Sequence, residues 1–95
     1  MNPESKHIEI DMTNIADKSA FEDLLSRHFQ VSEGTTEFWQ RLWNAFIPLP
    51  RACVIRLRGW AEFEQRMPRY ARRLRRMLAD YEEVVKSESL LIEYA

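Results

Sequence analysis

The centre of the chain reads Ala52-Cys53-Val54-Ile55-Arg56-Leu57-Arg58-Gly59-Trp60-Ala61-Glu62-Phe63-Glu64-Gln65. The short apolar run of residues 52–58 predicts a buried β-strand. Gly59 ends this strand, because glycine interrupts regular structure, and residues 60–65 predict a short helical turn. A strand that passes almost directly into a helix is typical of folds in which helices pack on a sheet.

Strands are also expected near both ends of the chain. Residues 7–12 alternate between polar and apolar, which places Ile8, Ile10 and Met12 on one face. Residues 90–94 are interpreted as the last strand, and residues 1–6 as an N-terminal tail. The side chains expected in the core are Ile8, Ile10, Val54, Ile55, Leu57, Leu91 and Ile92, with Trp43 and Phe63 mostly buried.

Two helices are expected between the first and second strands. Ser19 and Glu22 fit a capping box, in which each side chain satisfies a free backbone N–H at a helix start. A second helix is expected to begin with Thr35 or Thr36 as its N-cap. It should end before Pro48, because proline disfavours helix in the residue that precedes it.

A long helix is expected after the central helical turn, beginning near Pro68, where the missing proline N–H costs nothing. The order of elements is then β-α-α-β-α-α-β. Strands joined through helices pair in parallel with right-handed connections. The sequence therefore predicts an α/β fold in which a small three-stranded parallel sheet is packed with helices, in one domain spanning residues 1–95.

The expected second helix is amphipathic. Its inward stripe contains Trp39, Leu42, Trp43 and Phe46. The opposite stripe is polar and contains Glu37, Gln40, Arg41 and Asn44. From the residues alone, this polar stripe is either ordinary solvated surface or a surface for a partner.

Composition limits the class of protein. The 95 residues contain one cysteine, Cys53, which excludes an internal disulfide and is expected to be a buried, inert side chain. The N-terminus shows no signal-peptide pattern and no apolar stretch is long enough to span a membrane, so a cytoplasmic protein is expected. Residues 1–50 carry four basic and eight acidic side chains, whereas residues 51–95 carry ten and seven.

No pattern of residues indicates catalysis. His7 and His28 lie on expected regular elements without a nucleophile pattern, and no phosphate-binding loop or metal-ligand spacing is present. The pairs Glu62/Glu64 and Glu82/Glu83 are too close in sequence to face each other on a helix. We therefore expect a protein that is not an enzyme and has no cofactor or metal.

Residues 66–76 are rich in arginine: Arg66, Arg69, Arg72, Arg73, Arg75 and Arg76. The favoured interpretation is a solvated helix whose arginines pair with the acidic first half of the chain, with Arg76 and Asp80 as a local pair. The alternative is a face that contacts nucleic-acid phosphates. We expect the first, and hence no nucleic-acid partner.

Two segments carry a resemblance to a known family. They are Leu42-Trp43 within the second helix and Trp60-x-x-Phe63-Glu64-Gln65 after the central strand. Together with the order of elements, they resemble the barstar family of small ribonuclease inhibitors. The resemblance covers roughly residues 7–95. It implies a monomeric inhibitor or immunity protein, one half of a toxin–antitoxin pair, that binds a protein toxin and carries out no reaction.

The resemblance also implies a binding surface. In the family, the second helix and the loop before it block the ribonuclease active site, and two aspartates flank the Leu-Trp pair. Those positions are Gln40 and Asn44 here, and the family's loop tyrosines correspond to Gly34 and Thr35. An acid late in the long helix is matched by Glu82 or Glu83. The expected partner-binding residues are Gly34, Thr35, Glu37, Gln40, Arg41, Asn44, Glu82 and Glu83.

Three functions therefore remain open. The first is a barstar-like inhibitor of a toxin, expected to be a nuclease. The second is a nucleic-acid-binding module that uses the arginine-rich residues 66–76. The third is a domain with the barstar fold that binds an unrelated protein. The two amides keep the hydrogen bonding of the family's aspartates but lose the charge that steers association with a basic ribonuclease.

Overall fold

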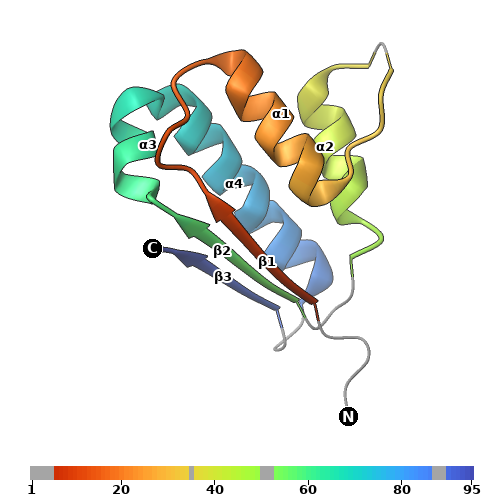
Figure 1. The fold of residues 1–95 in the computed structure, drawn as a ribbon. Helices are drawn as coiled ribbons and strands as arrows, with labels where there is room; N and C mark the ends of the chain where they lie inside the picture. The colour runs from red at the N-terminus through yellow and green to blue at the C-terminus, as the bar shows by residue number, and fades with distance from the viewer. Residues whose placement is uncertain (1–5, 35, 50–52, 87–89) are drawn as a thin grey trace.

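The structure is a computed structural model that describes residues 6–34, 36–49, 53–86 and 90–95. Seven elements follow one another in the predicted order β-α-α-β-α-α-β (Figure 1). They are β1 (Lys6–Asp11), α1 (Lys18–Phe29), α2 (Phe38–Phe46), β2 (Cys53–Arg58), α3 (Trp60–Arg66), α4 (Pro68–Val85) and β3 (Leu90–Tyr94).

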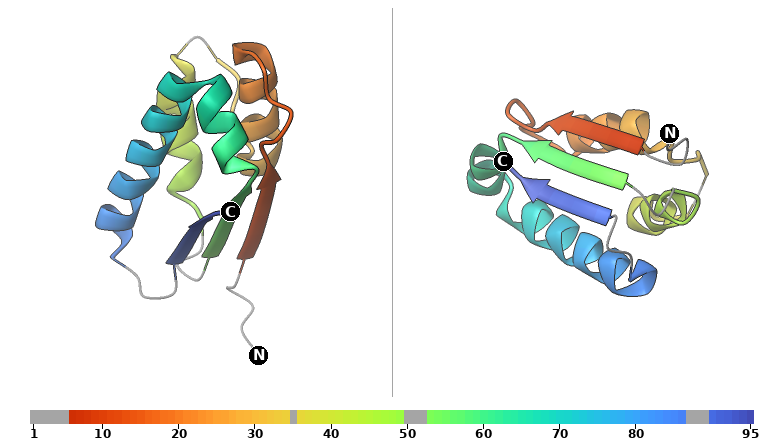
Figure 2. Two further views of the ribbon diagram at one scale, coloured as in Figure 1. Left: turned by 90° about the vertical axis from the view of Figure 1, so that its left-hand side faces the viewer. Right: turned by 90° about the horizontal axis from the view of Figure 1, so that it is seen from below.

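The three strands form one parallel sheet in the order β1-β2-β3, as predicted. The register aligns Ile8 with Ile55 and Ile55 with Ile92. Both crossovers step to the next strand in the same direction. Because such connections are right-handed, the helices gather on one side of the sheet, as Figures 1 and 2 show.

The sheet consequently has one covered face and one open face. The covered face carries alternate residues of each strand, Ile8 and Ile10 in β1, Cys53, Ile55 and Leu57 in β2, and Leu90, Ile92 and Tyr94 in β3. The prediction was wrong for Val54 and Leu91, which point to the open face. Leu91 is 51% exposed, and Val54 is half-buried. Ile92 is only half-buried but packs on the core.

The helix layer is joined by aromatic side chains around Phe21 of α1, which is fully buried. Its ring centroid lies 6.1 Å from that of Phe38 and 5.5 Å from that of Trp39, both in α2. It also lies 5.6 Å from Phe63 in α3 and 5.2 Å from Tyr70 in α4. Aromatic pairs at these separations are favourable beyond the area they bury, so one ring fixes three other helices. Phe63 is buried, as predicted.

Several predicted boundaries were wrong by one or two residues. The N-cap of α1 is Asp17, whose carboxylate accepts a hydrogen bond of 2.8 Å from the Ala20 N–H, so Ser19 lies inside the helix. Lys6, expected in the tail, already belongs to β1. The N-cap of α2 is Glu37 rather than Thr36, and Thr35 lies outside the described residues.

Cys53 is 1% exposed on the covered face of β2, as expected for an inert side chain. Burial raises the pKa of its thiol, because the thiolate would lose hydration. In the part of the chain that the structure describes, no helix is both long and apolar enough to cross a membrane.

The break after β2 requires glycine. Gly59 adopts φ +67°, in the left-handed region, and caps the start of α3. A Cβ at this position would lie 2.9 Å from the Thr13 backbone nitrogen and would also meet the Thr13 hydroxyl. Gly59 therefore lets the turn after β2 pack against the turn after β1.

We expect Gly59→Ala to lower the free energy of unfolding by about 2 kcal/mol or more, because left-handed strain adds to the clash with Thr13. Urea denaturation measures the change. Gly59→Asn is the control, since asparagine tolerates this backbone conformation but still carries a Cβ. Full stability of the Asn variant would contradict the close approach.

Candidate partner-binding surface

Helix α2 presents the polar stripe that its sequence predicts. Phe38, Trp39, Leu42 and Phe46 are buried, whereas Gln40 and Asn44 are exposed. Trp43, expected to be mostly buried, is intermediate in exposure and packs against the core. Its ring packs edge-on against Phe46 and Tyr81, at centroid distances of 6.4 Å each. The rest of the ring remains available at the surface.

The two amides on this stripe contact each other. The Gln40 Nε2 donates a hydrogen bond of 3.2 Å to the Asn44 Oδ1, one helical turn further along. Two aspartates at these positions would repel each other at the same spacing. The surface at this point is therefore neutral, and it offers hydrogen-bonding groups rather than charge.

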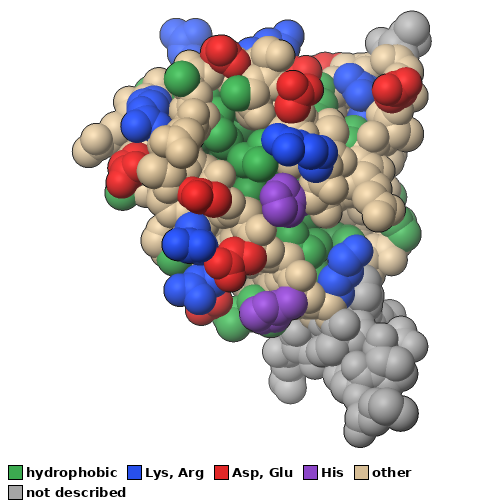
Figure 3. Space-filling view, in the orientation of Figure 1, with side chains coloured by type: hydrophobic (Ala, Val, Ile, Leu, Met, Phe, Trp, Pro, Cys, Tyr) green, Lys and Arg blue, Asp and Glu red, His purple; other side chains and the backbone are tan. Residues whose placement is uncertain are grey.

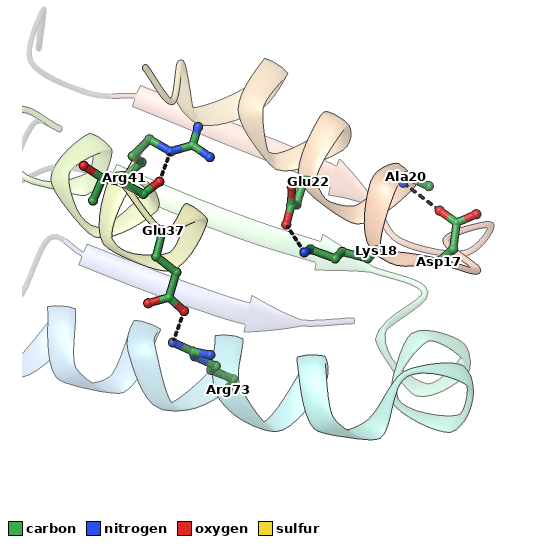
Figure 4. Close-up of polar contacts among 8 residues, drawn as sticks. Asp17, Lys18, Ala20, Glu22, Glu37, Arg41 and Arg73 are labelled. Atoms are coloured by element: carbon green, nitrogen blue, oxygen red, sulfur yellow. Dashed lines mark hydrogen bonds and ion pairs between the residues drawn. The ribbon is translucent and has the colours of Figure 1, made fainter. Parts of the chain in front are cut away.

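Glu37 connects the start of α2 to α4. Its backbone carbonyl accepts hydrogen bonds from the N–H groups of Gln40 and Arg41, both 3.1 Å. Its carboxylate pairs with the Arg73 guanidinium at 3.1 Å, as Figure 4 shows. The same guanidinium lies 4.6 Å from the centroid of the Trp39 ring, in the range of a cation–π contact. These contacts join the start of α2 to α4 at the surface, where both charged side chains are exposed.

Arg41 is turned back toward the loop that precedes α2. Its Nε donates to the Thr36 carbonyl at 2.8 Å, and its Nη1 donates to the Ser32 carbonyl at 2.9 Å (Figure 4 shows the first contact). The guanidinium also lies 5.7 Å from the Phe38 ring centroid. Arg41 therefore holds the loop against the helix, and its direct contact with a partner stays a prediction.

The remaining predicted residues separate into two groups. Gly34 is exposed in the loop before α2, with no atom within 4 Å of where a Cβ would stand. Glu82 and Glu83 are both exposed, but only Glu83 lines the groove between α2 and α4. The position of Glu83 on α4 therefore favours it over Glu82 as the acid that lies on the same surface as α2.

A groove of about 640 Å³ runs between α2 and α4. Its lining combines aromatic and aliphatic side chains with charged ones: Glu37, Trp39, Gln40, Trp43, Arg73, Arg76, Met77, Asp80, Glu83 and Val84. Of this lining, only Glu37, Gln40 and Glu83 are among the predicted partner-binding residues. Met77, Asp80 and Val84 of α4 were among those not predicted. Their helical spacing places Met77 and Val84 on an apolar stripe, yet Val84 is 70% exposed because it faces this groove.

The arginine-rich segment pairs only partly as predicted. Arg73 pairs with Glu37 of the acidic first half, as expected. Arg76 and Asp80 do not form the expected local ion pair, and Arg75 lies 4.0 Å from Glu64 in the second half. Figure 3 shows the side of the molecule on which β1 lies in front of α4, and there acidic and basic side chains are interspersed over the described residues.

Neither histidine joins a cluster that indicates a metal site. In the described ranges, no three side chains of His, Cys, Asp or Glu lie close enough together to hold a metal ion. The pKa of the Asp11 carboxyl is lowered, chiefly by hydrogen bonds from the Thr13 hydroxyl and N–H and further by nearby Arg58. That arrangement closes the turn after β1.

Comparison of the sequence with protein-family models gave no match, and comparison with curated proteins gave none either.

We expect Arg41→Ala to release the loop before α2, because the substitution removes two hydrogen bonds from a charged donor. The free energy of unfolding should fall by about 1 kcal/mol, since these bonds are exposed. The rate of hydrogen exchange at the loop amides should rise, because the loop opens more often. Gln40→Ala, which removes only the amide contact, is the control, and equal effects of the two variants would contradict the role of Arg41.

Proposed function

We propose that this protein is a barstar-like inhibitor or immunity protein that binds a toxin, a nuclease, at the groove between α2 and α4. The observation that carries the proposal is this groove, which adjoins the exposed stripe of Gln40 and Asn44. The chain itself carries out no reaction in this proposal; it acts by occupying a site on its partner. The sequence resemblance to the barstar family supports the same helix as the binding element.

The groove offers an apolar anchoring site. Trp43 and Met77 are half-buried, and Val84 is largely exposed. Covering exposed apolar side chains in a concave surface lowers the free energy of the complex. Interface hot spots lie in such desolvated pockets. An apolar or aromatic side chain of the partner is the complementary occupant.

The groove lining favours a cation beside that anchor, because its carboxylates outnumber its guanidinium groups by three to two. The carboxylates belong to Glu37, Asp80 and Glu83, and the guanidinium groups to Arg73 and Arg76. Glu37 is already neutralised by Arg73 at 3.1 Å. Asp80 and Glu83 also line the groove, and neither has an ion pair in the described part of the chain. A nuclease active site carries Lys, Arg and His for phosphate, so a carboxylate at the rim can face such a group.

The amides narrow the choice of target. Gln40 and Asn44 cannot compensate the buried charge of a strongly basic active site, and desolvating Lys or Arg against amides costs free energy. We therefore expect weak or no inhibition of a basic ribonuclease of the type that the family inhibits. The true target is a protein whose site accepts amides at these positions.

We expect the double change Gln40→Asp and Asn44→Asp to strengthen binding to a small basic ribonuclease by at least about tenfold, since each restored charge pair adds favourable electrostatics. The association rate should become more salt-sensitive. Surface plasmon resonance at several salt concentrations measures both. Gln40→Ala with Asn44→Ala is the control. Tight wild-type binding that the alanine pair leaves unchanged would place the interface on another surface.

The double-aspartate variant also permits a test of the groove. Adding Val84→Gln should weaken its binding to the same ribonuclease by about tenfold, because an apolar contact in the groove is lost. Leu91→Gln is the matched control: Leu91 is likewise exposed but lies on the open face of the sheet. Equal effects of Val84→Gln and Leu91→Gln would show that the groove is not part of the interface. Inhibition of no nuclease by any variant would favour the domain that binds an unrelated protein.

A further inference from the structure

The first half of α4 and the residues just before it form a strongly basic segment. Six arginines lie between residues 66 and 76, and no acidic residue lies between Glu64 and Asp80. The whole chain carries a formal net charge of −1. Basic charge is therefore concentrated on one part of an otherwise slightly acidic molecule.

Three of these arginines have partners within the fold. Arg66 donates to the Thr13 carbonyl. Arg73 pairs with Glu37 and stacks on Trp39. Arg75 lies 4.0 Å from the Glu64 carboxylate, and its guanidinium is 4.3 Å from the Tyr94 ring centroid. Each of these three side chains is held by a different element of the structure.

The other three form what we call the arginine row: Arg69, Arg72 and Arg76. All three are exposed, and none has an ion pair or a hydrogen-bond partner in the described residues. Within the described ranges, Arg73 alone among these arginines pairs with a carboxylate of the acidic first half, so the predicted internal pairing does not account for the row.

The row has the spacing of one helix stripe. Positions i, i+3 and i+7 lie on the same face of an α-helix and span about 10 Å along its axis. Like charges three or four residues apart destabilise a helix by about 0.2–0.5 kcal/mol per pair. An external anion removes this repulsion, since no carboxylate of the described residues lies within ion-pair distance of the row.

The surface beside the row is hollowed. Arg72, Arg75 and Arg76 line one shallow hollow of about 370 Å³, together with Pro68, Ala79 and Glu64. Glu64 is paired with Arg75 there. A second, smaller hollow at the other end of the row is lined by Arg69 and Arg73 with Trp39 and Tyr70. Arginine side chains therefore line two hollows beside the row.

We propose that the arginine row binds the phosphate backbone of a nucleic-acid strand. Arginine presents a planar fork that matches phosphate oxygens with two parallel hydrogen bonds. Binding to phosphates is driven by charge and needs no apolar anchor. The only large exposed hydrophobic side chains in the described residues are Ile47, Val84 and Leu91, and none of them lines either hollow. A membrane or an acidic protein surface would use such an anchor beside the charges.

This site does not depend on the proposed inhibition of a nuclease. Arg69 and Arg72 do not line the groove between α2 and α4, so they can be changed without altering it. Arg76 borders both surfaces and is left unchanged in the test.

The test is fluorescence anisotropy with a labelled single-stranded oligouridylate of about twelve nucleotides, between 50 and 200 mM salt. Three phosphate contacts predict a slope of log K against log salt near −2, hence binding about twentyfold weaker at the higher salt. Arg69→Glu with Arg72→Glu should weaken binding more than tenfold at 50 mM and bring the slope to about −0.7 or smaller in magnitude.

The control is Lys18→Glu with Arg27→Glu, two exposed changes on α1 that alter the net charge by the same amount. This variant should keep the affinity and the slope within twofold, and circular dichroism checks that both variants are folded. A single-stranded DNA of equal length distinguishes the source of the phosphates. Equal affinity for the two would mean that the site recognises the phosphate backbone common to RNA and DNA. Tighter binding to the RNA would mean that the site is specific for RNA.

Four results would overturn the proposal. They are no binding by the wild type at 50 mM salt, binding that salt does not weaken, equal losses in the α4 and α1 variants, and tighter binding to oligoglutamate or to phosphatidylserine vesicles than to the oligonucleotide. The last would assign the row to an acidic protein or to a membrane surface.

Discussion

The position of Phe21 is the constraint on which the helix layer depends. Its ring, on α1, packs against rings from α2, α3 and α4, with centroid distances of 5.2–6.1 Å. The ring centroids of Trp39 in α2 and Tyr70 in α4 also lie 6.2 Å apart. Packing of aromatic rings in the core therefore determines the orientation of α2 relative to α4. The groove on the outside is therefore a product of internal packing. The pair of Glu37 and Arg73 closes the same arrangement at the surface, where an exposed ion pair adds at most about 1 kcal/mol.

The sequence predicted the fold because most of its elements have a clear period. It did not predict which side of β3 faces the core. Leu90, Leu91 and Ile92 are all apolar, so no alternation of polar and apolar residues distinguishes the two faces of this strand. The inward positions of Leu90 and Tyr94 are set by the helices behind the sheet. Similarly, Asp17 and Ser19 are both good caps, and only the fold decides between them.

The candidate surface was predicted in part for a related reason. Helical spacing correctly placed Gln40 and Asn44 on the exposed face of α2. It did not reveal that Arg41 reaches back to Ser32 and Thr36, because periodicity says nothing about where a long side chain ends. The groove also requires two helices in their correct relative position, and no pattern within one helix contains that information. The same holds for the arginines of α4, whose division into held and free side chains depends on Glu37, Glu64 and Thr13.

The all-parallel sheet has a consequence for how the chain folds. Each strand pairs only with residues far along the sequence, as Lys6 with Cys53 and Cys53 with Leu90. The backbone entropy of closing these long loops is lost before the pairing contributes anything, which makes such sheets slow to form. Helix formation is local and fast by comparison. The strands, with their unpaired hydrogen-bonding edges, are therefore the part of a newly made chain most open to pairing with another molecule, and the helix layer must dock quickly to end that exposure.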